Sequence, residues 1–265
     1  MGTSASSSGP GSGVPMVPPW VSDPNADEDA PTAPPERPVP VAPRARFGGA
    51  RRAMGDFART GNRNEMRRAL GRYTERGMGG SRTEAARMSG AAARSGVLYG
   101  TLHTLAGTPT GESGAPPLSG LAGRPAREVI DAIVALVSPL DGSQDAESSQ
   151  RAISSALSDL LEENPEADLG GLTNVEIDWV VERHLVYEIH GRVQLDIGKA
   201  VVDNAPSPTA GLQRLQEIQD YIQETVAASF RERVQAGRPL TNGEATALAA
   251  AILEDTFAVF KEYVR

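Results

Sequence analysis

The chain has 265 residues and a formal net charge of -8, and 39% of its residues are hydrophobic, which is enough for a buried core. It contains no cysteine, so disulfides, thiolate catalysis and zinc sites with sulfur ligands are excluded. The sequence has no run of eighteen apolar residues and no signal-peptide pattern at its start, so we expect a cytoplasmic protein without a membrane-spanning helix.

The charge is unevenly distributed along the chain. Residues 1–43 carry a net charge of -4, residues 44–94 carry +9, and residues 95–265 carry -13. All thirteen cations of the middle stretch are arginines, which favour paired contacts with carboxylate or phosphate groups. This division indicates either docking of the basic stretch on the acidic body or a polyanionic partner.

Residues 1–43 are predicted to form a disordered tail, because they hold eleven of the twenty prolines and much serine. An apolar cluster near residues 14–20 adopts an extended, polyproline-like form by proline restriction and is typical of a docking segment. Its candidate partner-binding residues are Val14, Met16, Val17, Pro18, Pro19 and Trp20. The alternative is a mildly sticky linker.

A basic, arginine-rich helical segment is predicted for residues 44–105. The apolar spacing indicates helices over residues 50–60, ending at Gly61, and over residues 64–76. The sequence Ser81-Arg82-Thr83-Glu84 fits a capping box that starts a third helix, which runs through Leu102.

An acidic helical body is predicted for residues 121–265. Helices are expected after Pro125, over residues 146–163, after Pro208, and after capping boxes at residues 173–176 and 241–244. The helix from residue 173 to about 203 repeats an apolar residue at every fourth position, so we expect it to be central and buried. With no convincing strand, the predicted fold is all-α: a helical bundle-like domain preceded by the tail, with both helical segments in one globular unit.

Catalytic and metal-binding patterns are weak. His184 and Glu188 stand one helical turn apart and could share a metal, but His190 points elsewhere, and a helix-surface or satisfied core pair is the better interpretation. The sequence has neither G-x-S-x-G nor a phosphate-binding G-x-x-x-x-G-K-[ST] loop. We therefore predict no enzyme activity, no metal and no cofactor.

Two features could bind anions. The glycine-rich break before the third helix could hold a phosphate on free backbone amides, although consecutive helix caps explain it more simply. The helix over residues 64–76 could contact nucleic-acid phosphates, unless the acidic body neutralises it. The candidate anion-binding residues are Arg67, Arg68, Arg72, Arg76, Gly79, Gly80 and Arg82.

The second residue, Gly2, permits removal of Met1 and would leave an unhindered α-amine. The pKa of such an amine is near 8, so a useful neutral fraction exists at pH 7. We therefore regard Gly2 as a candidate modification site. The start also fits the myristoylation pattern M-G-x-x-x-[ST], but no adjacent basic patch supplies a second membrane signal, and no membrane association is predicted.

Several motifs together resemble the B component of the Qat anti-phage defence systems (QatB-like). They are the MGTS start with a tail reaching VPMVPPW, RF at Arg46-Phe47, FARTG at 57–61, RRALGRY at 67–73 and GGSRTEAARM at 79–88. Looser similarity extends through LAGRP at 121–125 and DIG at 196–198, and residues after Ser207 contribute little.

The resemblance implies a bacterial cytoplasmic protein that acts with three partners: an ATPase, a QueC-like (7-cyano-7-deazaguanine synthase-like) enzyme and a TatD-like nuclease. It implies a non-enzymatic adaptor of the QueC-like enzyme. That enzyme class activates a carboxylate with ATP and passes it to an amine, so Gly2 is the expected acceptor. The alternative is a nucleic-acid-binding sensor subunit that uses the arginine-rich segment.

Overall fold

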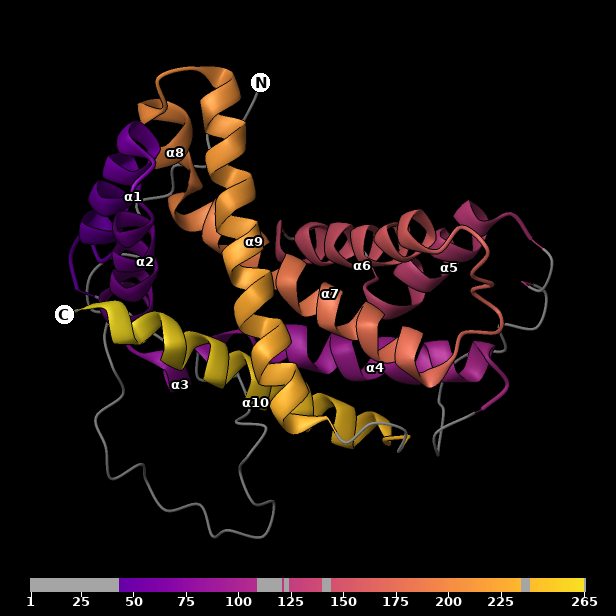
Figure 1. Ribbon diagram of the computed structural model, residues 1–265. Coiled ribbons are helices and arrows are strands. Elements are labelled where there is room, and N and C mark those ends of the chain that lie inside the picture. The colour runs from indigo at the N-terminus through magenta and orange to yellow at the C-terminus, as the bar shows by residue number, and fades with distance from the viewer. Residues whose placement is uncertain (1–42, 109–120, 122–123, 140–143, 235–238, 265) are drawn as a thin grey trace, which may run out of the picture. The chain divides into compact units, whose positions relative to one another are not determined.

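The computed structural model describes residues 43–108, 121, 124–139, 144–234 and 239–264 (Figure 1). All regular structure in these residues is helical, which confirms the all-α prediction. No helix among them is long and apolar enough to cross a membrane. The predicted disordered tail and its docking segment lie outside the described residues, apart from Pro43.

The described helices group into two compact units, each assembled from separate stretches of chain. Unit one comprises residues 1–89, 192–225 and 250–265, and unit two comprises residues 90–191 and 226–249. The grouping follows contacts in space and not chain order. The sequence-based division at residues 105 and 121 stays a prediction about how the chain is organised.

Unit one contains short helices and two π-helical turns. Its elements are α1 (Gly48–Thr60), α2 (Arg63–Arg72), η1 (Tyr73–Gly77), α3 (Ser81–Arg87), η2 (Gln194–Gly198), α8 (Lys199–Asn204), η3 (Glu262–Val264), the first part of α9 (Pro208–Arg233) and the last part of α10 (Asn242–Lys261). Helix α1 lies beside α2 and α8 (Figure 1). The prediction of a helix through Arg76 was correct in extent, but its last turn is π-helical.

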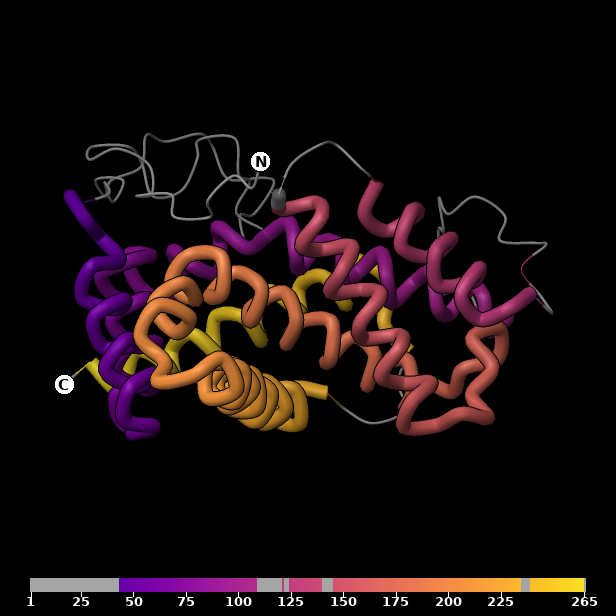
Figure 2. The backbone as a smooth tube through the Cα atoms, turned by 90° about the horizontal axis from the view of Figure 1, so that it is seen from above, coloured from indigo at the N-terminus to yellow at the C-terminus, as the bar shows by residue number. Residues whose placement is uncertain are grey.

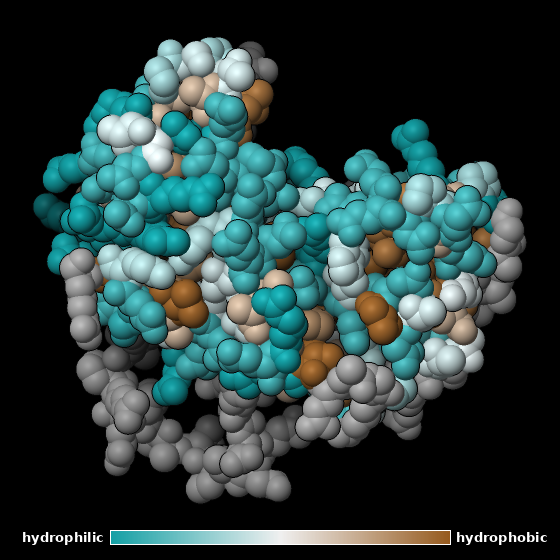
Figure 3. Space-filling model, viewed as in Figure 1, coloured by the Kyte–Doolittle hydropathy of each residue, from teal (hydrophilic) through white to brown (hydrophobic). Residues whose placement is uncertain are grey.

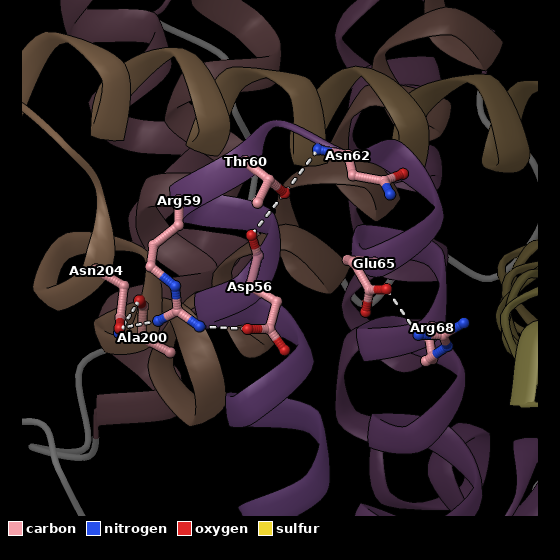
Figure 4. Close-up of polar contacts among 8 residues, drawn as sticks. All are labelled: Asp56, Arg59, Thr60, Asn62, Glu65, Arg68, Ala200 and Asn204. Carbon is pink, nitrogen blue, oxygen red and sulfur yellow. Dashed lines mark hydrogen bonds and ion pairs between the residues drawn. The ribbon is translucent and has the colours of Figure 1, made fainter.

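The turn between α1 and α2 is built as the sequence predicts. Gly61 adopts a left-handed φ of 70°, and its N–H donates to the carbonyl of Phe57, which caps α1. The side chain of Asn62 caps α2 by accepting from the N–H of Asn64 at 3.0 Å. Figure 4 shows Arg59 reaching from α1 to both Asp56 and Asn204, which joins α1 to α8.

The core of unit one contains a group of aromatic rings. The ring of Phe260 lies 5.8 Å from that of Tyr221 and 6.0 Å from that of Phe257. A Cβ added to Gly71 would lie 2.7 Å from the carbonyl oxygen of Phe260, so only glycine lets α2 approach α10 this closely.

The long helix predicted from residue 173 to about 203 is interrupted. It comprises α7 (Asn174–Val193), the π turn η2 and α8. All seven apolar residues at the four-residue spacing are buried, as predicted: Ile177, Val181, Leu185, Ile189, Val193, Ile197 and Val201. A step of four residues drifts around an α-helix, and the wider π turn reduces this drift, which is why the helix does not stay regular.

Unit two contains most of α4 (Ser89–Leu105), with α5 (Ala126–Val137), α6 (Gln144–Glu163), most of α7 and the remaining parts of α9 and α10. Helices α5 and α6 run side by side (Figure 2). Glycines in α4 admit the start of α10: a Cβ at Gly96 would lie 2.5 Å from the Asn242 carbonyl oxygen and 2.0 Å from Thr246 Oγ1. The Tyr99 hydroxyl accepts a 2.9 Å hydrogen bond from the Leu240 N–H.

Two of the three predicted capping boxes are confirmed. Thr173 and Glu176 bond to each other's backbone N–H groups at the start of α7, and Thr241 and Glu244 do the same near the start of α10. The box at Ser81 was wrong, because Gly80 occupies the N-cap position without a side-chain cap bond and Glu84 is buried. The predicted third helix also breaks at Met88, into α3 and α4.

The surface is mainly polar. The face drawn in Figure 3 is mostly hydrophilic, and hydrophobic side chains appear on it in small separate groups. On α9, Leu212 is 70% exposed, whereas Ile218, Ile222 and Val226 are buried.

The close approach at Gly96 predicts a large effect of a single methyl group. We expect Gly96→Ala to lower the free energy of unfolding by about 2 to 3 kcal/mol, because the added Cβ meets backbone as well as side-chain atoms. Gly243→Ala is the matched control, since no atom lies within 4 Å of a Cβ at that helical position. Chemical denaturation measures both, and equal stabilities would contradict the close contact.

Candidate functional site

A buried group of polar and aromatic residues in unit one is the candidate site. It brings together the stretch before α1, the π turns η1 and η2, helix α3 and the last residues of α7. We name it the Asp196 cluster; its members are Arg46, Phe47, Arg51, Tyr73, Thr74, Glu84, Arg87, Arg192 and Asp196. Four of the motifs that carry the family resemblance contribute to it: RF, RRALGRY, GGSRTEAARM and DIG.

Asp196 joins the cluster through both its side chain and its backbone. Its Oδ2 accepts hydrogen bonds from the Tyr73 hydroxyl at 2.9 Å and from Arg192 Nε at 3.2 Å. Its carbonyl oxygen accepts from Arg51 Nε at 3.1 Å and Nη2 at 2.9 Å. Tyr73 and Arg51 lie far from Asp196 in sequence, so these bonds fix η1 and α1 against η2.

Phe47 fixes the start of the folded chain. The residue is 2% exposed, and its ring stacks on that of Tyr73, with 5.6 Å between centroids and an interplanar angle of 21°. The guanidinium of Arg46 lies 4.6 Å from the Phe47 ring centroid, and that of Arg51 lies 5.7 Å away. A Cβ at Gly77 would lie 2.8 Å from the Phe47 ring, so the ring occupies space that only glycine leaves open.

Backbone geometry directs Arg46 and Phe47 inward. Ala45 has a positive φ of 49°, which is uncommon for a residue other than glycine. Its carbonyl accepts a 2.7 Å bond from the Gly48 N–H, and the Phe47 carbonyl then accepts from the Arg51 N–H at 2.9 Å. This tight turn leads directly into α1.

Glu84 is fully buried, and its surroundings destabilise the ionised form of its carboxyl group. Burial, helped by the charge of Asp196, raises its pKa to about 8, although the Thr74 hydroxyl and the charges of Arg192 and Arg87 act in the opposite direction. Neither carboxyl oxygen has the geometry of a hydrogen bond to any residue that the structure describes, and the same holds for the Thr74 hydroxyl. At pH 7 Glu84 is therefore mainly a neutral acid that can donate a hydrogen bond.

The other ionisable members of the cluster are perturbed as well. Burial lowers the pKa of Arg46 and of Arg87, and the charge of Arg192 lowers both. Burial and the charges of Asp196 and Glu84 raise the pKa of the Tyr73 hydroxyl well above its ordinary value. The cluster is thus a buried network in which one carboxylate faces several guanidinium groups.

The arginines predicted to bind anions make contacts within unit one. Arg67 lies 5.5 Å from the Tyr221 ring centroid and 5.4 Å from that of Tyr263. Arg68 pairs with Glu65 at 2.6 Å (Figure 4). The remaining contacts are Arg72 Nη1 with the Gly49 carbonyl at 3.4 Å and Arg82 Nε with Glu254 at 3.4 Å, while Arg76 is exposed.

The glycine-rich break has a conformational role. Gly79 and Gly80 have φ values of 86° and 102°, which explains why glycines occupy these positions. The Gly80 N–H donates to the Thr74 carbonyl at 2.9 Å, so this amide is used within the turn. Anion binding by these two glycines stays a prediction.

His184 and Glu188 form a buried pair in unit two. His184 is fully buried; its Nδ1 lies 3.1 Å from Ser95 Oγ, and its Nε2 lies 3.3 Å from Glu188 Oε1 without the alignment of a hydrogen bond. Burial raises the pKa of Glu188, but the close approach of His184, together with Arg94 and Ser149, outweighs this effect and holds the pKa at about 2. Ser95 donates to the Ala91 carbonyl at 3.0 Å, and it too is fully buried, so substrates do not reach this Ser–His–Glu arrangement.

Two groups of predicted site residues lie outside the described residues. They are the modification candidate Gly2 and the docking segment, Val14 to Trp20. Among the described residues, no group of three histidine, aspartate or glutamate side chains is placed to hold a metal ion.

Fold and site together define an all-helical protein built around two buried polar networks. A family model described as Qat anti-phage system associated protein QatB matches residues 79–260. This is more than half of the chain, which therefore belongs to the QatB family and has a role in anti-phage defence as a component of the Qat system. No curated protein and no solved structure matches the chain.

The family match covers a different stretch from the motifs that suggested it. The motifs that resemble the family lie mainly in residues 1–100, and residues after Ser207 contribute little to them. The family model, in contrast, matches the chain as far as residue 260. The match includes Glu84, Arg192 and Asp196 of the cluster and begins after Arg46 and Tyr73.

The raised pKa of Glu84 predicts a pH dependence of stability. Between its ordinary value of 4.5 and about 8, the folded chain holds a proton on Glu84 that the unfolded chain has lost. Stability is therefore highest at low pH within this window and falls as the pH rises, by about 3 to 5 kcal/mol in all.

Glu84→Gln should flatten this dependence and raise stability at the upper end of the window. Urea denaturation between about pH 5 and about pH 8 measures the stability of both chains. Glu128→Gln, which removes an exposed carboxylate on α5, is the control and should leave the slope unchanged. A parallel loss of stability with pH in wild type and Glu84→Gln would contradict the assignment.

Proposed function

We propose that this chain is a non-enzymatic adaptor of the Qat system whose Gly2 is modified by a QueC-like ATP-dependent enzyme. The observation that carries the proposal is the burial of Arg46 and Phe47 in the Asp196 cluster. It attaches the N-terminal tail to a fixed point of unit one. A chain end that starts from a fixed point can be presented to a partner enzyme.

The chemistry of the chain end suits an acyl or amide acceptor. Removal of Met1 leaves a glycine amine without a side chain to hinder attack, and its pKa near 8 provides a neutral fraction at pH 7. The tail is predicted from its composition to be disordered, and a disordered tail of this length would span roughly 35 to 40 Å on average, enough to enter an active site on another protein. Tethering also raises the effective concentration of the amine at a docked partner.

The buried serine of unit two supports a non-enzymatic role. Ser95 and His184 are the described residues that come nearest to a nucleophile and its base, and neither is exposed. In the proposal the body binds the QueC-like enzyme, and the docking segment around Trp20 holds the tail near its active site. The ATPase and the TatD-like nuclease are proposed as further partners, and the cytoplasm as the location.

Nucleic-acid sensing through the arginine-rich segment is the alternative, and the described contacts favour the adaptor. Arg67 lies over two tyrosine rings, Arg68 pairs with Glu65, and Arg72 bonds to a backbone carbonyl. These contacts are made within unit one, so nucleic acid would have to compete with them.

Intact-mass measurement after co-expression with the QueC-like enzyme tests modification of Gly2. We expect a mass increase on the wild-type chain that is lost when Gly2 is deleted, because the unhindered glycine amine is then replaced by the amine of a residue with a side chain. Trp20→Ala should lower the modified fraction several-fold, and Val41→Ala, in the same tail but outside the docking segment, should leave it unchanged. An adduct that persists without Gly2, or full modification of Trp20→Ala, would count against the proposal.

The nucleic-acid alternative has a separate test. Fluorescence anisotropy with labelled DNA and RNA should show no salt-sensitive binding by the full chain, since the arginine contacts are internal. Binding that weakens steeply with salt, and that is lost in a variant with Arg67, Arg68, Arg72 and Arg76 changed to glutamine, would establish the sensor function instead.

A further inference from the structure

The Asp196 cluster contains buried polar groups that its own residues do not satisfy. Arg46 is 6% exposed, and two of its guanidinium nitrogens, Nε and Nη1, have no hydrogen-bond partner among the described residues. The Thr74 hydroxyl and the Glu84 carboxyl lie beside each other without good hydrogen-bond geometry, so Arg46 is the clearest unsatisfied group of the cluster. An unsatisfied buried polar group is costly, and an arginine cannot avoid the cost by losing its proton at neutral pH.

Charge within the cluster is also unbalanced around Arg46. The guanidinium groups of Arg46, Arg87 and Arg192 lie close enough for their positive charges to oppose one another. Asp196 is near all three, but its Oδ2 already accepts from Tyr73 and Arg192. An additional anion would relieve both the repulsion and the missing hydrogen bonds.

We propose that the Asp196 cluster binds a phosphoryl group, with the Arg46 guanidinium as its principal ligand and with Arg87 and Arg192 as neighbouring positive charges. A phosphoryl group carries up to two negative charges and several acceptor oxygens, which suits several guanidinium groups better than a single carboxylate does. Glu84, as a neutral acid, adds no negative charge that would repel the ligand.

The site has a route to solvent. The side chain of Arg192 is 26% exposed and that of Asp196 is 17% exposed, so the cluster reaches the surface beside this pair. In the proposal, a small anion enters beside this pair. The ligand is either free inorganic phosphate or the phosphate of a nucleotide, since both present the same chemistry to these donors.

Thermal unfolding of the full chain tests the site, with inorganic phosphate, AMP, acetate and chloride compared at matched ionic strength. We expect inorganic phosphate to raise the wild-type Tm by about 5 to 10 °C at a hundred-fold excess over Kd, with little effect of chloride or acetate. An equal shift with AMP would identify a nucleotide phosphate, and a shift with inorganic phosphate alone would identify the free ion. No shift beyond that in chloride, or an equal shift in acetate, would overturn the proposal.

Variants of Arg46 locate the effect. Arg46→Met should abolish the phosphate-dependent rise in Tm, and Arg46→Lys, which keeps the charge and protects the fold, should lose most of it. Arg52→Met is the matched control, because Arg52 is an exposed arginine on α1 and should leave the shift unchanged. An undiminished phosphate shift in Arg46→Lys would show that binding occurs elsewhere.

Discussion

Asp196 accepts hydrogen bonds from Tyr73 and Arg51, residues more than a hundred positions earlier in the chain. These bonds, with the one from Arg192, hold α1, η1 and η2 together around a single part-buried carboxylate. Loss of its charge would leave the surrounding guanidinium groups without their shared anion, a change that costs on the order of a few kcal/mol. The geometry of unit one therefore depends on this one acidic group.

The proposed function depends on the position in which the Asp196 cluster holds the start of the folded chain. Phe47 is fixed between Tyr73, Gly77 and two arginines, so the chain enters α1 from a defined position. In the proposed adaptor, this position is the origin of a tail that delivers Gly2 to a partner enzyme. In that proposal the folded body supplies attachment and binding surface, and the acceptor amine lies at the end of the chain.

Features that depend on neighbouring residues could be predicted from the sequence. Electrostatic interactions between residues far apart in the sequence could not. Helix ends at Gly61 and capping boxes at 173–176 and 241–244 depend on local hydrogen bonds, which the sequence displays directly. The π turn at 194–198 arises from packing along the whole stripe and has no local signature. Glu84 fits a capping box by spacing, but its burial against partners distant in sequence gives it another role. The only sequence signal for the cluster was the four motifs that contribute residues to it. Their spacing along the chain did not show that these residues lie together.

Hydrogen–deuterium exchange of the full chain, comparing wild type with Asp196→Asn, tests most directly whether Asp196 holds the start of the folded chain. Asparagine keeps the shape of the side chain and removes its charge. The amides of residues 48–52 should be protected in wild type and exchange at least ten-fold faster in the variant, which corresponds to about 1.4 kcal/mol. The amides of α7 between residues 178 and 190, in unit two, should be unaffected. Unchanged protection of residues 48–52 would contradict the role given to Asp196.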